Sequence, residues 1–120
     1  MSRDHRKLRA FELVDGLVIE IYQATGQFPR EELFGLTAQM RRAAVSSAAN
    51  IVEGCAREGE KEYLHFLNIA FGSLREVGYF LDLAARLSYL APDEFQRLDS
   101  MYEEAASVMA GLIRARKRKS

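Results

Sequence analysis

Glu62 and His65 have the spacing that comes closest to a catalytic pattern in this sequence. A Glu-x-x-His pair places both side chains on one helix face, as in di-iron helical bundles, where carboxylates and imidazoles hold the metal ions. Such a centre needs a second Glu-x-x-His pair and two more glutamates, and the only other histidine is His5, near the N-terminus. The sequence therefore predicts no metal site, and we expect His65 to lie on a polar helix face.

The remaining reactive side chains do not form an enzyme pattern either. The sequence contains no glycine-rich phosphate loop, no Ser/His/Asp order and no cysteine cluster, and its carboxylates do not single out an acid and a base. The single cysteine, Cys55, cannot form an intramolecular disulfide and has no histidine close to it in sequence, which indicates a small packing residue. We expect a protein without catalysis and without a cofactor.

Basic side chains gather at both ends of a chain whose net charge is zero. Residues 1–10 sum to 4 − 1 = +3 and residues 111–120 to +5, which leaves 0 − 8 = −8 for the residues between them. Such segments are typical of proteins that contact the phosphates of nucleic acids; alternatively, they are solubilising tails that neutralise acidic neighbours or complement a helix C-terminus. Neither segment holds an aromatic residue for base stacking, so we expect contact without sequence preference. The nucleic-acid-binding candidates are Arg3, Arg6, Lys7, Arg9, Arg114, Arg116, Lys117, Arg118 and Lys119.

A second set of polar residues lies on one face of a helical stretch from Gly35 to Gly54. At about 100° per residue this face holds Gln39, Arg42, Ser46, Asn50 and Glu53. Between residues 43 and 49 every side chain except one valine is Ala or Ser, so a neighbouring backbone could approach closely.

Two interpretations of this polar face remain open. It is either the solvated side of an amphipathic helix or a satisfied polar seam that fixes helix register or subunit contacts. In the second case Arg42 is the first candidate partner for Glu53, and Arg41 or a group on the third helix is the alternative. The residues assigned to the seam are Arg42, Asn50, Glu53 and Glu76.

Apolar spacing and helix-ending residues predict the elements that carry these groups. We predict four helices, at about Leu8–Thr25, at about Ala38–Cys55, from the charged loop Arg57–Lys61 to about Leu87, and at about Pro92–Arg116. The residues that mark their ends are Gly26 after the first helix, Pro29 before a short turn through Glu31 and Glu32, Thr37 as the cap of the second helix, and Pro92 in the first turn of the fourth.

Short connections make successive helices antiparallel neighbours. We therefore predict an all-α, antiparallel up-down-up-down four-helix bundle, with residues 1–120 as a single domain; 120 residues with 48% hydrophobic content can bury their own core. Both termini then emerge at one end, which collects about 3 + 5 = 8 positive charges there. One cysteine, no apolar leader and no run of 18 apolar residues favour a cytoplasmic protein without a membrane span.

The third helix carries more apolar surface than a bundle of one chain needs. Between Tyr63 and Leu87 the large apolar side chains spread over more than half of the circumference. A helix in a monomeric bundle usually needs one apolar stripe about 100° wide. The excess predicts a second buried contact, most simply with another copy of the chain; the alternative is a helix central to its own bundle.

The sequence also resembles a known family. The motifs are RRAAVS, N-I-x-E-G and G-S-L-x-E, within GLTAQMRRAAVSSAANIVEG (35–54) and FLNIAFGSLREVGYFLDLAARLSYL (66–90). They are similar to those of the four-helix bundle proteins encoded by intervening sequences of bacterial 23S rRNA genes, and the likeness extends over nearly the whole chain from about Phe11. That family often carries a proline shortly after RRAAVS, where this chain has Ser47, Ala48 and Ala49.

The resemblance has implications beyond the residues themselves. The family is similar in fold to the accessory protein of diversity-generating retroelements, which assists a reverse transcriptase. It implies a homopentamer of four-helix subunits, no catalysis, and a reverse transcriptase as a possible partner. Together with the charge pattern, this predicts a non-catalytic, self-assembling bundle that binds RNA or DNA through the basic end; the alternative is an oligomeric protein–protein adaptor.

Overall fold

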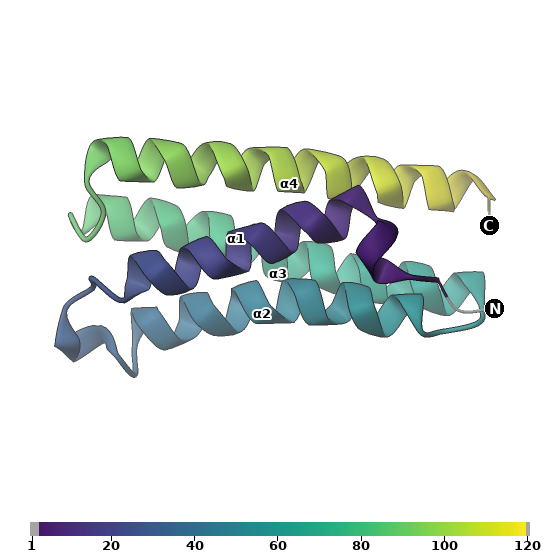
Figure 1. The fold of residues 1–120 in the computed structure, drawn as a ribbon, viewed down its shortest axis with the longest axis horizontal. Helices are drawn as coiled ribbons and strands as arrows, with labels where there is room; N and C mark the ends of the chain where they lie inside the picture. The colour runs from purple at the N-terminus through teal and green to yellow at the C-terminus, as the bar shows by residue number, and fades with distance from the viewer. Residues whose placement is uncertain (1–2, 120) are drawn as a thin grey trace.

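Four long helices make up most of the computed structural model, which describes residues 3–119. The elements are the 3₁₀ turn η1 (His5–Lys7), α1 (Arg9–Thr25), the 3₁₀ turn η2 (Arg30–Glu32), α2 (Leu36–Cys55), α3 (Glu60–Arg86) and α4 (Pro92–Lys119). Successive helices run in opposite directions and are joined by short connections (Figure 1). The predicted all-α, up-down-up-down four-helix bundle is confirmed.

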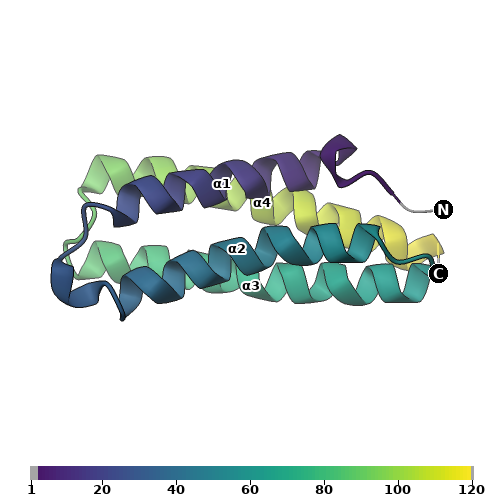
Figure 2. The ribbon, with the colours of Figure 1, turned by 60° about the horizontal axis from the view of Figure 1, so that its bottom comes forward.

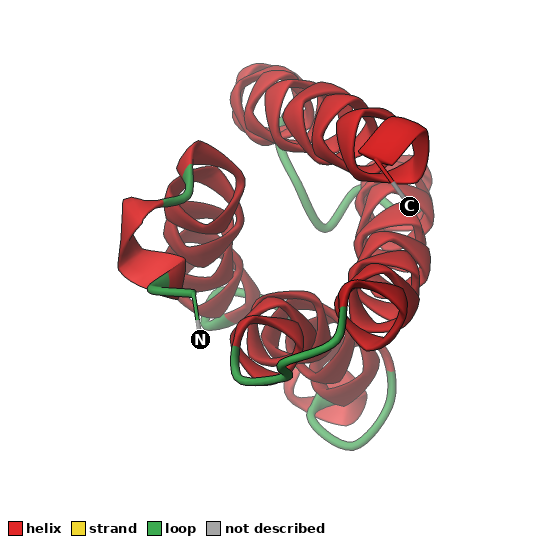
Figure 3. Ribbon diagram, turned by 90° about the vertical axis from the view of Figure 1, so that its right-hand side faces the viewer, coloured by secondary structure: helices red, strands yellow, loops and turns green. Residues whose placement is uncertain are grey.

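The helices form a closed ring around a shared core. Each helix packs against the next one in sequence, and α4 packs against α1 (Figure 3). Figure 2 shows α2 and α3 side by side along their length. The molecule is elongated, with extents of 45 × 24 × 19 Å. None of the helices within residues 3–119 combines the length and the apolar content needed to cross a membrane.

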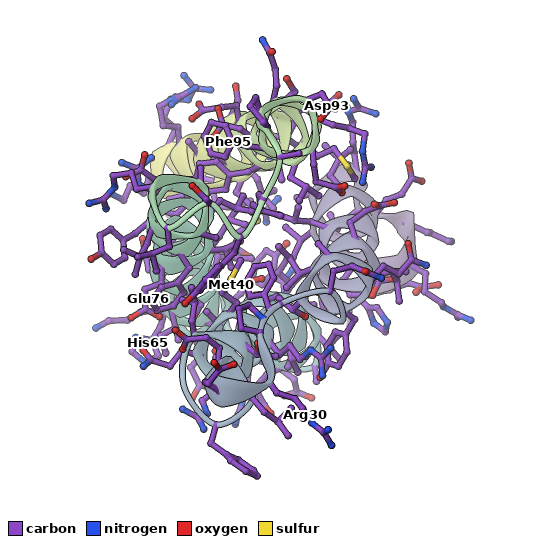
Figure 4. The ribbon with its side chains drawn as sticks, turned by 90° about the vertical axis from the view of Figure 1, so that its left-hand side faces the viewer. Arg30, Met40, His65, Glu76, Asp93 and Phe95 are labelled. Carbon is purple, nitrogen blue, oxygen red and sulfur yellow. The ribbon has the colours of Figure 1, made fainter. Side chains whose placement is uncertain are left out.

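Each helix contributes one buried stripe at intervals of three or four residues. In Figure 4 Met40 of α2 points into the interior, whereas Arg30 and Asp93 point outward. The stripe of α3 consists of Tyr63, Leu67, Ala70, Leu74, Val77, Leu81 and Ala84. The predicted excess of apolar surface is present on the same helix, because Ile69 is 39% exposed and Tyr79 is 56% exposed.

Small residues allow α2 and α3 to approach closely. A Cβ atom on Gly54 would lie 3.0 Å from Phe66 Cβ and 3.3 Å from the Tyr63 carbonyl oxygen. Further along the same contact, the hydroxyls of Ser46 and Ser73 are 2.9 Å apart. The Ala and Ser run of α2 therefore faces a neighbouring helix, as its composition suggests.

The start of α2 differs from the prediction. The prediction of Thr37 as its cap was wrong, because Thr37 is buried inside the first turn and Gly35 occupies the cap position without a capping side chain of its own. Glu32, from the preceding η2 turn, instead accepts a hydrogen bond from the Leu36 N–H at 3.0 Å. A carboxylate is a favourable partner for the free N–H groups at a helix start. Glu32 therefore caps α2 in place of Thr37.

Two other boundaries were placed inaccurately. The α3 helix already begins at Glu60, so the loop is shorter than the predicted Arg57–Lys61 run. The α4 helix continues past Arg116 to Lys119, and its last turn is entirely basic. Cations at a helix C-terminus lie close to its unpaired carbonyl groups, which favours this extension.

Candidate nucleic-acid interface

Three segments meet at the end of the bundle that carries both termini (Figures 1 and 3). We call this end, made of residues 3–9, 53–62 and 111–119, the basic pole. The charges of the three segments sum to +3, 2 − 4 = −2 and +5, a total of +6, and the rest of the chain therefore carries −6. The pole is less positive than the predicted +8, because the loop between α2 and α3 adds net negative charge.

Within the basic pole, Arg3 and Arg116 pair with Glu60 beside the ring of Tyr63, and we call these four residues the Glu60 cluster. Arg116 Nε donates a hydrogen bond to Glu60 Oε1 at 2.6 Å, and Arg3 donates to Oε2 of the same carboxylate. The guanidinium carbons of Arg3 and Arg116 lie 3.9 Å and 5.6 Å from the centre of the Tyr63 ring. The cluster thus joins the two ends of the chain to the first turn of α3.

The electrostatics of the cluster favour a charged Glu60. The hydrogen bond from Arg116, followed by the interactions with Arg3, lowers the pKa of the Glu60 carboxyl below its ordinary value, against an opposing effect of burial. The side chains of Arg3, Arg116 and Glu60 retain 24%, 25% and 31% of their surface. The group is therefore partly open to solvent.

The other predicted nucleic-acid-binding residues divide into two sets. Arg6 pairs with Asp4 at 3.0 Å and Arg9 with Glu104 at 2.7 Å, both on the surface. The hydrogen bond from Arg6 lowers the pKa of Asp4. The remaining predicted residues, all exposed, are Lys7, Arg114, Lys117, Arg118 and Lys119. The N-terminal charges are therefore largely paired within the chain, and the last turn of α4 adds three exposed cations, Lys117, Arg118 and Lys119.

Three residues of this end were not singled out from the sequence, namely Arg57, Glu60 and Tyr63. Arg57 donates to Glu53 at 2.7 Å and lies 4.9 Å from the centre of the Phe66 ring, and its buried Nε has no hydrogen-bond partner among the described residues. The predicted topology could have pointed to these residues, because an antiparallel four-helix bundle places the loop between its second and third helices beside both termini.

The predicted polar seam is mostly a solvated surface within one chain. Arg42, Glu53 and Glu76 are exposed, and the prediction that Arg42 pairs with Glu53 was wrong, because Glu53 pairs with Arg57 in the connection that follows α2. Asn50 is half-buried, and its amide donates to the Ser46 carbonyl at 2.9 Å. The polar link between α2 and α3 is instead the pair of serine hydroxyls described above.

Arg42 and Glu76 do share one feature. They line a shallow groove between α2 and α3, together with Gln39, Ala43, Ser46, Ser73 and Phe80. Figure 4 shows Glu76 and His65 on the outer surface of the bundle.

The side chains considered for metal binding and nucleophilic chemistry do not form a reactive site. Glu62 and His65 are exposed, and His65 contacts the Phe66 ring edge-on at 5.4 Å between centroids. Within residues 3–119, no group of three His, Cys, Asp or Glu side chains is positioned to hold a metal ion. Cys55 is buried, and burial raises the pKa of its thiol, which disfavours the nucleophilic thiolate.

Comparison with protein families identifies this architecture. The model of the 23S rRNA-intervening sequence protein family matches residues 6–111. The chain belongs to this family. The match covers α1, α2 and α3 and most of α4, and it confirms the resemblance noted in the motifs of α2 and α3. It ends before Arg114, so the exposed cations of the last turn of α4 lie outside the part that the family model matches.

A solved structure has the same fold. The chain is similar to a protein of unknown function from the S23 ribosomal protein family of Bacteroides thetaiotaomicron, with a TM-score of 0.79 and 20% sequence identity. The similarity covers 88% of this chain and 95% of that protein. At this level of identity the likeness shows a shared fold. No curated protein matches the chain.

Proposed function

We propose that this 23S rRNA-intervening sequence protein family member is a non-catalytic, self-assembling bundle that binds RNA or DNA without sequence preference through its basic pole. The observation that carries the proposal is the concentration of +6 at one end of an otherwise acidic chain of zero net charge. Cations gathered in this way bind polyanions by releasing the counterions condensed on the phosphates. The acidic remainder repels the same polyanion and confines contact to the pole.

Self-assembly is the second part of the proposal. Apolar side chains are exposed on the outer faces of α2 and α3, where Val45, Val52 and Ile69 keep 42%, 37% and 39% of their surface. A second copy would remove these side chains from water, and the family resemblance implies five copies. In a ring with rotational symmetry all basic poles point in the same direction, so assembly would multiply the contacts with one nucleic acid. The proposal also includes a reverse transcriptase as a partner, on the ground of the family resemblance. It places the protein in the cytoplasm, because a single cysteine suits a reducing compartment.

The binding test compares two matched pairs of exposed arginines. R114Q/R118Q removes two charges from the basic pole, and R30Q/R42Q removes two from the rest of the molecule; all four residues are exposed and outside the ion pairs found in residues 3–119. Truncation after Ile113 is a poorer test, because it also removes Arg116 and with it a partner of Glu60.

Binding of a fluorescent single-stranded oligonucleotide should be measured over a series of chloride concentrations. We expect R114Q/R118Q to flatten the slope of log affinity against log salt by about 1.4, from two contacts at about 0.7 each, and R30Q/R42Q to leave it unchanged. Absence of binding by the wild type at low salt, or equal effects of both variants, would refute the nucleic-acid role. In that case an adaptor function becomes the better proposal, with Leu33 and Phe34, 50% and 92% exposed at the opposite end, as its first contact candidates.

A further inference from the structure

Glu60 occupies a position that an external anion could also fill. Its two carboxylate oxygens are divided between two arginines that come from opposite ends of the chain, with Arg116 on Oε1 and Arg3 on Oε2. Arg3 is held in place by its backbone N–H, which donates to the Cys55 carbonyl at 2.9 Å, and by Nη1, which donates to the Arg57 carbonyl at 3.0 Å. Arg3 is therefore held in place independently of Glu60 and of any bound ligand.

The same two guanidinium groups are suited to phosphate. Planar guanidinium groups bind carboxylate and phosphate oxygens with the same fork of N–H donors, and each such charge-assisted contact is stronger than a neutral hydrogen bond. The Tyr63 ring, itself 1% exposed, lies beneath both groups and orients them through cation–π contacts. A phosphodiester offers two free oxygens, as does the carboxylate that now lies between the arginines.

Release of these arginines requires a small movement. Glu60 is the first residue of α3, directly after the Ala56–Gly59 connection, and its side chain retains 31% of its surface. Rotation of this one side chain toward solvent frees both arginines without moving a helix. The cost is the loss of two ion pairs that are still partly open to water, which is lower than for a fully buried pair.

We propose that Glu60 occupies a two-arginine phosphate site formed by Arg3 and Arg116, and that the phosphodiester backbone of a bound nucleic acid displaces it. This inference rests on the proposed function and adds an internal competitor to it. The exposed cations of the last turn of α4 make the first contact, and Arg3 and Arg116 contribute only when Glu60 has turned away. The wild-type protein consequently binds more weakly than the charge of its basic pole would allow.

The test compares Glu60→Gln with Glu62→Gln. Both variants remove one negative charge from the first turn of α3, but Glu62 is exposed and forms none of the ion pairs found in residues 3–119. In phosphate-free chloride buffer, we expect E60Q to bind a single-stranded oligonucleotide about tenfold more tightly than E62Q at 50 mM salt. Its salt slope should be steeper by about 1.4, as expected for two additional phosphate contacts.

A second pair of variants keeps the charge constant. Glu60→Asp shortens the side chain by one methylene, so that one carboxylate no longer reaches both arginines, and Glu62→Asp is its control. We expect E60D to gain affinity relative to E62D, by less than E60Q gains over E62Q. Thermal unfolding by circular dichroism establishes that each variant is folded.

The outcomes separate this inference from the proposed function. Suppose that the wild type binds the oligonucleotide and that R114Q/R118Q binds it more weakly, but that E60Q and E62Q have equal affinities. The role of Glu60 as an internal competitor is then refuted, and the proposal that the basic pole binds nucleic acid is retained. Weaker binding by E60Q, or loss of the fold in both E60Q and E60D, makes Glu60 a structural contact and also refutes it. If neither the wild type nor E60Q binds at low salt, both proposals fail.

Discussion

Tyr102 illustrates how a single residue depends on the absence of a side chain elsewhere. Its ring lies on the backbone of Gly78 in α3, and Arg75 donates a hydrogen bond to its hydroxyl at 3.1 Å. The ring is 4% exposed, and burial raises the pKa of the phenol. A Cβ atom on Gly78 would lie 2.7 Å from both Cε2 and Oη of Tyr102. Glycine is required here for close packing of α3 and α4.

We therefore expect Gly78→Ala to destabilise the protein by about 1–3 kcal/mol, because Tyr102 must leave its place or push α4 outward. The matched control is Gly72→Ala on the same helix, where an added Cβ meets nothing within 4 Å. That control should stabilise the protein by about 0.5–1 kcal/mol, because alanine favours a helix interior. Urea unfolding measures both, and equal effects of the two changes would contradict the packing argument.

Glu53 was assigned from the sequence to a polar seam, but in the structure it forms a surface ion pair. Its pair with Arg57 leaves 48% of the Glu53 side chain and 40% of the Arg57 side chain exposed. Exposed pairs four residues apart on a helix contribute little to stability. Periodicity placed Glu53 on the correct face of α2, but it could not distinguish a face turned to water from one turned to another helix.

At the scale of the elements, the side chain of Glu32 connects the η2 turn to the start of α2 and to the connection between α3 and α4. It accepts hydrogen bonds from the Leu36 N–H at the start of α2 and, at 2.8 Å, from the hydroxyl of Tyr89 between α3 and α4. These two bonds, the first being the stronger cause, lower the pKa of Glu32 below its ordinary value of 4.5. The folded protein thus prefers the carboxylate, whose stabilisation is complete above about pH 4.5 and is lost as the pH falls through the lowered pKa.

The corresponding prediction concerns Glu32→Ala, with its exposed neighbour Glu31→Ala as the control. Wild type and E31A should lose thermal stability in parallel as the pH is lowered below 4.5. E32A should start from a lower Tm at neutral pH and show a shallower decline over the same acidic range, because it lacks this contribution. Calorimetry from pH 3 to pH 7 measures both, and parallel curves for all three proteins would exclude Glu32 as the cap of α2.

The elements themselves were largely predictable, and the contacts between them were not. Apolar spacing located all four helices, and Gly26 and Pro92 lie at the ends where they were expected. The cap of α2 was missed because a glutamate from a preceding turn replaces the usual short hydroxyl side chain. Topology predicted that both termini share one end, but the pairing of Glu60 depends on the rotation of α3 after a short loop, which sequence periodicity does not specify.

At the scale of the whole molecule, the proposed assembly can be tested directly. Light scattering at micromolar concentration should give about five times the chain mass, 5 × 13.6 = 68 kDa. Ile69→Glu places a charge among the exposed apolar side chains of α3 and should shift the mass toward the monomer, whereas Glu62→Gln should not. A wild-type monomer over this range would exclude self-assembly, and a dimer or tetramer would exclude only the number of copies.

The uneven charge also makes the chain a strong electric dipole, directed along its 45 Å axis although the net charge is zero. Near the isoelectric point of about 6.7, with no net repulsion to keep molecules apart, opposite ends of different molecules attract each other. We expect head-to-tail association at low ionic strength that disperses near 0.1 M salt, where the screening length falls to about 10 Å. The electric field of a polyanion orients the molecule before contact, so that it approaches the nucleic-acid strand with its basic pole first and its long axis directed at the strand.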